Sequence, residues 1–419
     1  MFNGELLGAE GGFGEILAVE VVAEGLPLLA KALRKKWPDV HIIGIGGRRM
    51  EEAGVELIAH TSDAFGLFEA VSSLGKLKTA LKKARDALDA CKPNVLIPID
   101  YPDFNLKVAA AAKRRGVKIV YYVSPQVWAW RRRRIKKIAH LVDRMAVILP
   151  FEERIYQDAG VKCEFVGHPV LEEIEAVLAS AVGSRQSGAG NQTFYGLSPV
   201  AINPKLKTHF KSALGFHPER QLLSCLPGSR PSEMKRHFPV LVDMIRQLKR
   251  DSEMGSAGNY QFCIPLAPNT DEEKYKRYFE QLRGEDVVIK KGESVRVLAA
   301  SDIAVVTSGT ATLQTALLEV PMVVIYRLSP LTYQLGRRIV KVRHISLVNI
   351  LSGKEVVQEL LQERATPHEV VRELRRIVLD RQYREDMLAE FRVIRAQFAG
   401  KRPSERVAEI VMEMAGRKE

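Results

Sequence analysis

Cysteine is scarce in this sequence, and long hydrophobic runs are missing. The chain has four cysteines among 419 residues, and no two of them form a C-x-x-C pair. This usage argues against a disulfide framework or a zinc site and favours reduced thiols in the cytoplasm. No apolar run reaches the roughly 18 residues of a membrane-spanning helix. The first residues lack a basic start followed by an apolar run, so we expect no secretory signal.

Three motifs that identify common nucleotide and metal enzymes are also missing. The glycines at 44–47 do not form a dinucleotide fingerprint, because the third glycine of G-x-G-x-x-G would fall at Arg49. There is no G-x-x-x-x-G-K-[ST], which argues against a P-loop ATPase. There is no D-x-D, the usual metal clamp of metal-dependent sugar-nucleotide enzymes. We therefore expect no NAD, no metal and no other cofactor.

Positive charge, in contrast, is present in excess. Lys and Arg number 63 against 50 Asp and Glu, so the formal net charge is +13. An excess of this kind suits nucleic acid, an anionic membrane surface or a phosphorylated substrate. Hydrophobic residues make up 46% and charged residues 27% of the chain, which excludes a disordered or low-complexity protein. The length allows two or three domains.

Short apolar runs alternate with longer helical patterns along most of the chain. The runs are rich in Val and Ile, as buried parallel strands are, and strands that alternate with helices indicate doubly wound parallel sheets. The predicted fold class is therefore α/β, with two Rossmann-like doubly wound domains that face each other across a cleft. The predicted strands are 41–46, 95–100, 118–123, 144–149 and 164–166 in the first half, and 222–226, 261–265, 287–290, 303–307 and 322–327 in the second.

The domain boundaries follow from a change in composition. Residues 183–218 are rich in Gly, Ser, Asn and Pro and have no sustained periodicity, so we interpret them as a linker with an insertion. We expect one α/β domain over 1–182 and a second over 219–365. Helical patterns fill 366–419, and we place these C-terminal helices where they can pack back on the N-terminal domain.

A carboxylate at the end of a predicted strand is the first candidate for catalysis. Ligands of such sheets bind outside the carboxyl ends of the strands. Asp100 directly follows the run 95–99, where a carboxylate can accept a proton from a hydroxyl nucleophile. Asp103 and Asn105 come next, and either of them can instead simply cap the following helix.

Two strand-to-helix turns in the second half are candidates for anion binding. Gly228, Ser229 and Arg230 follow one strand, and Ser308, Gly309 and Thr310 follow another. Small residues let the backbone approach an anion, the helix start offers free N–H groups, and an arginine can hold two phosphate oxygens. Two such turns suit a diphosphate. The alternative is an ordinary βα turn with a surface arginine and a helix start capped by Ser or Thr.

Two segments combine apolar or aromatic residues with cations. Phe65, Leu67 and Phe68 precede a basic run over 76–85, which fits lipid contact or an ordinary buried segment followed by a solvated helix face. Trp128, Trp130 and Arg131 begin a basic run that ends at 137. Aromatics beside cations occur at membrane interfaces and on single-stranded nucleic acid. No aromatic–basic repeat or recognition helix supports nucleic acid, so we expect none.

Taken together, these segments resemble the lipid-A-disaccharide synthase family, inverting glycosyltransferases of the two-domain glycosyltransferase-B fold. The most specific block is YVSPQVWAWR at 122–131, and LPGSR and SGTAT are shared more loosely with related folds. The resemblance covers about residues 26–180 and 215–415. The matching blocks lie, in order, at 44–50, 99–105, 122–131, 149–152, 165–169, 226–230, 308–312, 321–324 and 349–351.

The resemblance implies an activity and the roles of several residues. The family transfers a diacylated glucosamine from its UDP derivative to diacylglucosamine 1-phosphate, which gives the β-1,6-linked lipid A disaccharide and UDP. Asp100 then resembles the base for the acceptor's 6-hydroxyl, and Arg230 with the helix start at 308–310 resembles the group that holds the diphosphate. The UDP-sugar is a substrate and not a cofactor. The other implied substrate contacts are Asp103, Asn105, Gly228, Ser229, Ser308, Gly309, Thr310, Gln314 and Asn349.

The resemblance also implies partners and a location. The partners are a UDP-activated acylated glucosamine, an acylated glucosamine phosphate and the anionic inner-membrane surface. The protein is then cytoplasmic and peripheral, with the acceptor and lipid on the N-terminal domain and the UDP donor on the second. The implied lipid or membrane contacts are Phe65, Leu67, Phe68, Trp128, Trp130 and Arg131.

The chain departs from the family pattern in three places, one of which is the linker at 183–218, which is longer than the family needs. The family's G-E-x-S-G-D loop has no counterpart in the first 25 residues, and the family's Glu after the SGTAT block is Gln314 here. Two alternative functions therefore stay open. One is another UDP-sugar transferase or epimerase of the same fold, and the other is a homologue that binds lipid with weakened or no turnover.

Overall fold

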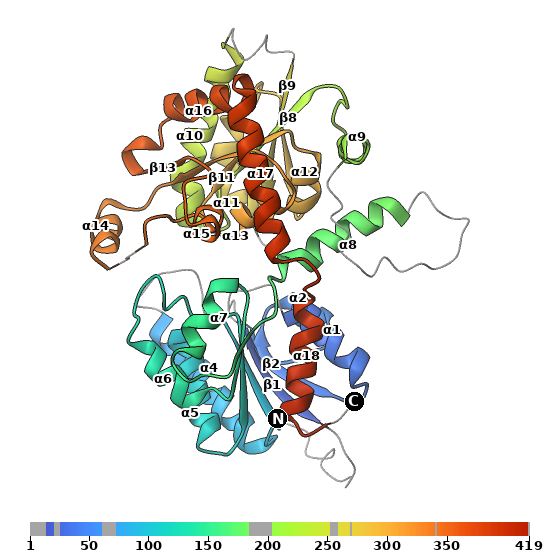
Figure 1. Cartoon of the computed structure of the whole chain (residues 1–419), viewed down its shortest axis with the longest axis vertical. Helices are drawn as coiled ribbons and strands as arrows, with labels where there is room; N and C mark the ends of the chain where they lie inside the picture. The colour runs from blue at the N-terminus through green and yellow to red at the C-terminus, as the bar shows by residue number, and fades with distance from the viewer. Residues whose placement is uncertain are drawn as a thin grey trace. The chain divides into compact units, whose positions relative to one another are not determined.

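The structure is a computed structural model that describes residues 14–20, 26–60, 73–183, 203–251, 259–268, 270–339 and 342–417. The chain divides into two compact units (Figure 1). Unit 1 comprises Met1–Pro169 together with Lys401–Glu419, and unit 2 comprises Val170–Gly400.

Unit 1 is built on a parallel sheet of seven strands in the order β3-β2-β1-β4-β5-β6-β7. The central strand β1 pairs with β2 on one side and β4 on the other, and its residues from Ile16 to Val19 are fully buried. The sequence patterns predict five of these strands and miss β1 and β3. The strands are β1 (Glu15–Glu20), β2 (His41–Gly46), β3 (Glu56–His60), β4 (Val95–Ile99), β5 (Lys118–Tyr122), β6 (Arg144–Val147) and β7 (Cys163–Phe165).

Helices connect the strands of unit 1, and the last helix of the chain joins them. Helix α18 packs beside α1, and Val407 and Val411 enter the same apolar core as Leu29 and Leu33. The helices are α1 (Leu26–Lys36), α2 (Arg48–Glu52), α4 (Ser73–Ala90), α5 (Pro102–Lys113), α6 (Arg134–Leu141), α7 (Pro150–Gln157) and α18 (Pro403–Met414).

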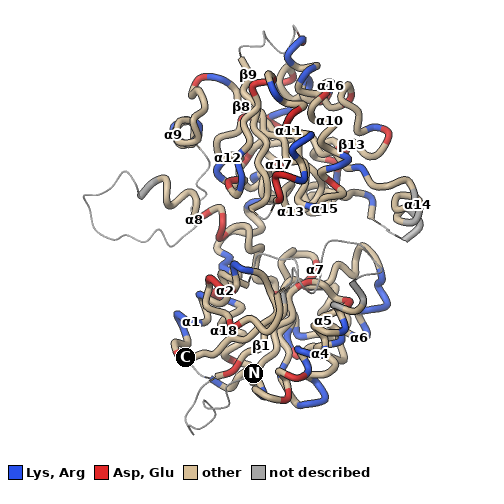
Figure 2. The backbone as a smooth tube through the Cα atoms, turned by 180° about the vertical axis from the view of Figure 1, so that it is seen from behind, with Lys and Arg blue, Asp and Glu red and all other residues tan. Residues whose placement is uncertain are grey.

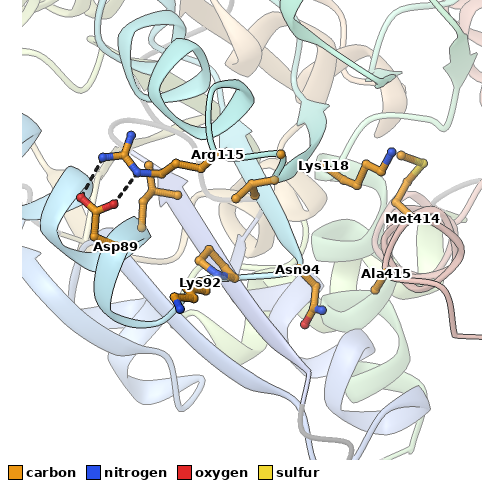
Figure 3. Close-up of a pocket in the computed structure, with 11 residues that line it drawn as sticks. Asp89, Lys92, Asn94, Arg115, Lys118, Met414 and Ala415 are labelled. Carbon is orange, nitrogen blue, oxygen red and sulfur yellow. Dashed lines mark hydrogen bonds and ion pairs between the residues drawn. The ribbon is translucent and has the colours of Figure 1, made fainter.

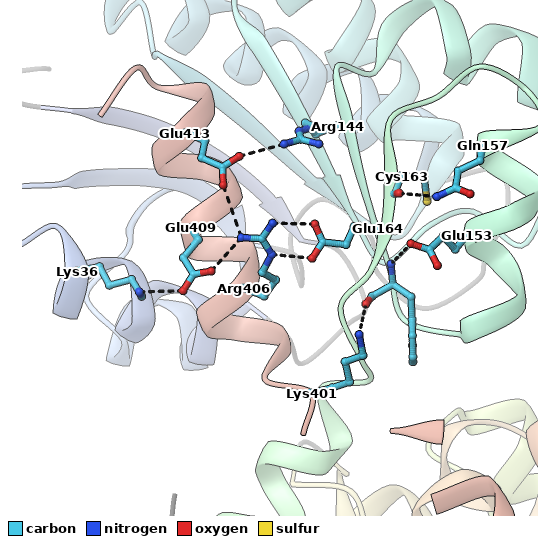
Figure 4. A network of polar contacts seen from close by, with 11 residues as sticks. Lys36, Arg144, Glu153, Gln157, Cys163, Glu164, Lys401, Arg406, Glu409 and Glu413 are labelled. Atoms are coloured by element: carbon cyan, nitrogen blue, oxygen red, sulfur yellow. Dashed lines mark hydrogen bonds and ion pairs between the residues drawn. The ribbon is translucent and has the colours of Figure 1, made fainter. Parts of the chain in front are cut away.

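A network of ion pairs fastens α18 to unit 1 (Figure 4). The Arg406 guanidinium binds both carboxylate oxygens of Glu164, at 2.6 and 2.9 Å. Glu409 lies between Arg406 and Lys36, at 3.0 Å from each, and Arg144 pairs with Glu413. Bidentate Arg–carboxylate pairs fix orientation as well as adding energy. The last helix of the chain therefore belongs structurally to the unit that contains the first strand.

Unit 2 is built on a parallel sheet of six strands in the order β10-β9-β8-β11-β12-β13. Strands β8, β9 and β11 are almost completely buried, as the apolar runs predict. The predicted class, α/β with two Rossmann-like parallel sheets, is confirmed. The strands are β8 (Gln221–Leu226), β9 (Tyr260–Leu266), β10 (Val287–Lys291), β11 (Ile303–Thr307), β12 (Met322–Tyr326) and β13 (Glu359–Leu361).

The helices of unit 2 include one inside the region expected to be a linker. Helix α9 begins after Asn203, whose side chain accepts a hydrogen bond from the Leu206 N–H, and Lys211 of this helix pairs with Asp302. Helix α9 has ten residues, three of them lysines, and lies in a region rich in Gly, Ser, Asn and Pro, which hid its short helical pattern. The helices are α8 (Val170–Gly183), α9 (Pro204–Ala213), α10 (Pro231–Lys249), α11 (Glu272–Glu280), α12 (Ser294–Ala300), α13 (Thr310–Leu317), α14 (Pro330–Ile339), α15 (Leu347–Ser352), η1 (Gln362–Arg364), α16 (Pro367–Leu379) and α17 (Arg381–Gln397).

Candidate active site

Asp100 lies at the carboxyl end of β4 in a backbone conformation that is unusual for a residue with a side chain. Its φ is +51°, and the φ of the next residue, Tyr101, is +35°. Two successive residues in the left-handed region cost free energy, which the surrounding structure must supply. Positions of this kind concentrate at functional sites. The strain is consistent with a residue whose placement matters for chemistry.

Hydrogen bonds hold the Asp100 backbone in this conformation. Its carbonyl oxygen accepts from Asn105 Nδ2 and from the Tyr121 hydroxyl, each at 2.7 Å. Its N–H donates to the carbonyls of Tyr122 and Val123 at the end of β5. Burial raises the pKa of Tyr121 well above its usual range, so the hydroxyl remains a donor. The Asp100 backbone is thereby fixed at the carboxyl ends of the strands, where such folds bind ligands.

The Asn105 side chain contacts the backbone of Asp100. Its side chain is completely buried, and Nδ2 also donates to the Ile99 carbonyl at 3.0 Å. In this structure Asn105 is a positioning residue for Asp100, and its implied substrate contact stays a prediction.

Asp103 lies one turn further along and is paired with two arginines. Its carboxylate contacts Arg134 and lies 3.1 Å from Arg131 Nη1. Both guanidinium groups also lie over the ring of Trp130, at 4.5 Å for Arg131 and 5.5 Å for Arg134. Trp130 is 37% exposed. Asp103, the arginines and Trp130 thus form a surface cluster in which the carboxylate is already neutralised.

The basic run that begins in this cluster continues into α6. Figure 2 shows Lys and Arg gathered along this segment. Arg131, Arg132, Arg133, Lys136 and Lys137 are all exposed. A surface with an exposed tryptophan and several cations fits an anionic partner. Phe65, Leu67 and Phe68 lie outside the described residues.

Trp128 differs from Trp130 because it faces a buried carboxyl group. Its indole N–H donates to Glu152 Oε1 at 3.0 Å, and its ring packs edge-on against Phe151 at 5.1 Å. The Ser124 hydroxyl donates to the same Glu152 oxygen at 2.9 Å. These contacts give Trp128 a structural role within unit 1. Glu152 is a feature that the sequence reasoning did not single out.

Burial raises the pKa of Glu152 to about 7. The unfolded chain releases this proton near pH 4.5, so between about 4.5 and 7 the native state binds more protons than the unfolded state. Stability therefore falls as the pH rises through this window. Glu152→Gln cannot titrate, so we expect it to lack the pH-dependent contribution of Glu152 to the unfolding free energy. The difference in unfolding free energy between wild type and variant should therefore change by about 2 kcal/mol from pH 5 to pH 8.

Tryptophan fluorescence measures this effect selectively. All three tryptophans, Trp37, Trp128 and Trp130, belong to unit 1, so their emission follows the unfolding of this unit. Denaturant unfolding at pH 5 and pH 8 gives the two free energies for each protein. If the unfolding free energies of wild type and variant differed by the same amount at both pH values, Glu152 would be ionised across the whole range.

In unit 2, a carboxylate of the protein itself accepts hydrogen bonds from the loop before α10. Glu233 Oε2 accepts hydrogen bonds from the N–H groups of Ser229 and Arg230, both at 3.2 Å. Gly228 has φ +101°, and a Cβ there would lie 2.5 Å from the same oxygen. The N–H groups of Ser229 and Arg230 are therefore already paired with Glu233 in this structure. The Arg230 side chain, 52% exposed and 3.4 Å from Glu233 Oε1, stays available to a phosphate.

The turn before α13 is open. Gly309 has φ +146°, nothing lies within 4 Å of a Cβ built on it, and Gly309 and Thr310 are both exposed. The first N–H groups of a helix have no partner within the helix, and the helix dipole favours an anion there. Ser308 donates to the Ile345 carbonyl at 2.8 Å, which fixes the turn. This helix start is the better diphosphate site of the two.

Gln314 and Asn349, two further candidates, differ sharply in their surroundings. Gln314 lies one turn into α13 from Thr310 and is nearly buried, and its side chain has no hydrogen bond to the described residues. The Asn349 side chain is fully buried, donates to the Val357 carbonyl and to Glu359, and accepts from the N–H groups of Val356 and Val357. Asn349 has no free polar group, so its implied substrate contact is wrong, whereas Gln314 keeps its polar group for a ligand.

A sizeable cavity lies away from these residues. It measures about 540 Å³ and is lined by Lys92, Asn94 and Lys118 at the amino ends of β4 and β5, together with the Asp89–Arg115 ion pair (Figure 3). Asp100 lies at the opposite edge of the same sheet. Ligands of such folds bind at the carboxyl edge, so size alone does not make this cavity the active site.

The described residues offer one strained carboxylate at the ligand-binding edge of unit 1 and one open helix start with an exposed arginine at that of unit 2. Within these parts of the chain, no group of three or more His, Cys, Asp or Glu side chains is placed to hold a metal ion. None of the helices described has the length and apolar character needed to cross a membrane. Chemically, the groups can accept a proton and can bind an anionic phosphate.

Comparisons with known proteins agree with this chemistry. A family model described as lipid-A-disaccharide synthetase matches residues 17–187 and 198–411. The lipid-A-disaccharide synthase of Geobacter metallireducens is 38% identical over 94% of both chains, and that of Myxococcus xanthus is 37% identical over 96% of this chain and 94% of its own. The UDP-GlcNAc 2-epimerase of Neisseria meningitidis, solved with UDP-GlcNAc, has a TM-score of 0.62 at 9% identity over 96% of this chain and all of its own, which shows a shared fold.

Proposed function

The chain belongs to the lipid-A-disaccharide synthase family, and we propose that it joins two acylated glucosamines into the lipid A disaccharide. The donor is UDP-2,3-diacylglucosamine, and the acceptor is 2,3-diacylglucosamine 1-phosphate. The products are the β-1,6-linked disaccharide 1-phosphate and UDP. The family match along nearly the whole chain carries this proposal.

Asp100 is the base in the proposed reaction. Its carboxylate takes the proton of the acceptor's 6-hydroxyl while that oxygen bonds to the anomeric carbon of the donor. The bond from this carbon to the UDP oxygen breaks at the same time, so the configuration of the carbon inverts. The hydrogen bonds from Asn105 and Tyr121 to the Asp100 backbone keep the base in place throughout.

Unit 2 stabilises the leaving group. Negative charge develops on the diphosphate as UDP departs, and donors that are already in place stabilise such charge best. We assign this role to the helix start at Ser308–Thr310, with Arg230 as the mobile cation and Gln314 as a contact for the ribose hydroxyls. The proposed step requires one cation and one helix dipole at the diphosphate, and it uses no metal.

The experiment that tests this function supplies both acylated substrates to the purified protein. We expect equal amounts of disaccharide and UDP. With UDP-N-acetylglucosamine in place of the acylated donor, we expect neither a disaccharide nor a 2-epimer. Release of UDP without acyl chains, or 2-epimerisation, would instead identify another enzyme of this fold, and donor binding without any turnover would identify a lipid-binding homologue.

We also propose that the protein works at the cytoplasmic face of the inner membrane, docked through the basic surface that includes Trp130. Both substrates are acylated and carry phosphate groups, and each cation near an anionic surface contributes about 1 kcal/mol. The exposed residues Arg132 and Lys136 carry two of these charges.

Charge reversal tests the docking. We expect Arg132→Glu combined with Lys136→Glu to lower binding to vesicles that contain anionic lipid by about tenfold or more. Cosedimentation measures the bound fraction, and Lys92→Glu, an exposed lysine at the other edge of the sheet in unit 1, is the matched control. Equal binding by the double variant and the control would remove this surface from the membrane contact.

A further inference from the structure

A fully buried histidine joins three strand ends of unit 2. His237 belongs to α10, and its imidazole Nδ1 lies 2.9 Å from the Pro227 carbonyl oxygen, just after β8. Its Nε2 accepts a hydrogen bond of 2.8 Å from the Arg327 N–H, just after β12. Thr307, the last residue of β11, places its hydroxyl 3.3 Å from Nδ1. One side chain thus contacts three adjacent strands at their carboxyl ends.

These contacts assign the tautomer of the ring. The Arg327 backbone can only donate, so Nε2 carries no proton and Nδ1 carries the single one. Nδ1–H therefore donates to the Pro227 carbonyl, while the Thr307 hydroxyl donates to the Leu226 carbonyl at 2.8 Å. A protonated ring would place a second N–H against the Arg327 N–H. Burial correspondingly lowers the pKa of His237 to about 4, so the ring is neutral at physiological pH.

The tied strand ends are those that lead into the proposed donor site. Pro227 is followed directly by Gly228, Ser229 and Arg230, and Thr307 is followed by the open helix start. The distance between the arginine and this helix start decides whether both can contact one diphosphate. A fixed, fully hydrogen-bonded ring between the two strands sets that distance more strictly than packing of apolar side chains would.

We propose that His237 is a positioning residue of the donor site, which holds the Arg230 loop and the α13 start at the spacing of a diphosphate. The inference rests on the proposed function, because it takes a UDP-sugar as the donor. It assigns to His237 no contact with substrate. The functional consequence is selective: ligands with two phosphates depend on His237, and ligands with one phosphate depend on it much less.

Two conservative variants separate the two hydrogen bonds of the ring. In His237→Asn the side-chain amide can still donate to the Pro227 carbonyl, and in His237→Gln the side-chain oxygen can still accept from the Arg327 N–H. Each variant therefore loses one of the two hydrogen bonds of the imidazole ring. Ser301→Ala is the matched control, because Ser301 is equally buried in unit 2 but precedes β11 at the opposite edge, where it contacts Ser224 and the Val297 carbonyl.

Calorimetric titration with UDP and with UMP gives the test. We expect both His237 variants to bind UDP about tenfold more weakly than the wild type, and to bind UMP within about twofold of it. The Ser301→Ala control should keep the wild-type affinity for both, with a comparable loss of thermal stability. Two results would overturn the inference about His237 and leave the proposed function standing. One is a UDP affinity within about twofold of wild type in both His237 variants, and the other is an equal loss of affinity for UDP and UMP. Failure of the unchanged protein to bind UDP would overturn the proposed donor site itself.

Discussion

Replacing Asp100 by asparagine is expected to lower turnover about a thousandfold and to leave UDP affinity nearly unchanged. Asparagine is the best substitute because it tolerates the left-handed conformation that Asp100 adopts with φ +51°. The backbone hydrogen bonds from Asn105 and Tyr121 stay in place, since both end on the Asp100 carbonyl. The variant therefore removes the base and little else.

Asp103→Asn is the matched control for this experiment. Its carboxylate lies three residues further along, is exposed and pairs with Arg131 and Arg134. We expect Asp103→Asn to keep most of the turnover. Steady-state rates with both substrates, together with calorimetric binding of UDP, measure the two effects separately. If Asp100→Asn lost UDP binding and turnover in equal proportion, Asp100 would have a structural and not a catalytic role.

The second large effect is expected on the other unit. Arg230→Ala should weaken the binding of UDP about thirtyfold, because a charge-assisted contact to a phosphate contributes about 2 kcal/mol. Turnover should fall as well, since the same cation stabilises the departing diphosphate. The Arg230 side chain is half exposed and only loosely paired with Glu233, at 3.4 Å, so its removal does not disturb a core.

Lys235→Ala provides the control for Arg230. Lys235 is an exposed cation of α10, the helix that begins after Arg230, so its loss changes the net charge of the protein equally. We expect UDP affinity to stay at the wild-type value in this variant. Arg230→Lys should recover part of the affinity through the charge but not the two-point contact of a guanidinium. Unchanged UDP binding by Arg230→Ala would remove Arg230 from the diphosphate site.

The sequence predicts those strands and site residues that depend only on a local pattern of apolar and polar residues. The buried strands β4, β8 and β11 are largely apolar, and Asp100, Gly228 and Ser308 follow them within two residues. The topology therefore places these residues at the carboxyl ends of the strands, where ligands bind. Two of the three strands that were missed carry weaker signals, whereas β1 was missed although its residues from Ile16 to Val19 form a buried apolar run. Strand β3 is a half-exposed edge strand, and β13 has only three residues.

The parts of the site that could not be predicted depend on partners that are distant in the sequence. His237 contacts residues that lie 10, 70 and 90 positions away along the chain. The burial of Asn349 depends on Glu359 of β13, a strand that was itself missed. Glu233 illustrates another limit, because its carboxylate accepts hydrogen bonds from N–H groups at the loop where the sequence analysis expected an anion.

The most direct test of the proposed reaction is the anomeric configuration of its product. The purified protein is incubated with UDP-2,3-diacylglucosamine and 2,3-diacylglucosamine 1-phosphate in the presence of EDTA, and the product is analysed by NMR. We predict a β-1,6-linked disaccharide, one UDP released for each disaccharide formed, and a rate that EDTA does not change. A retained α configuration, or activity that EDTA abolishes and magnesium restores, would contradict a single displacement with Asp100 as the base and protein cations at the diphosphate.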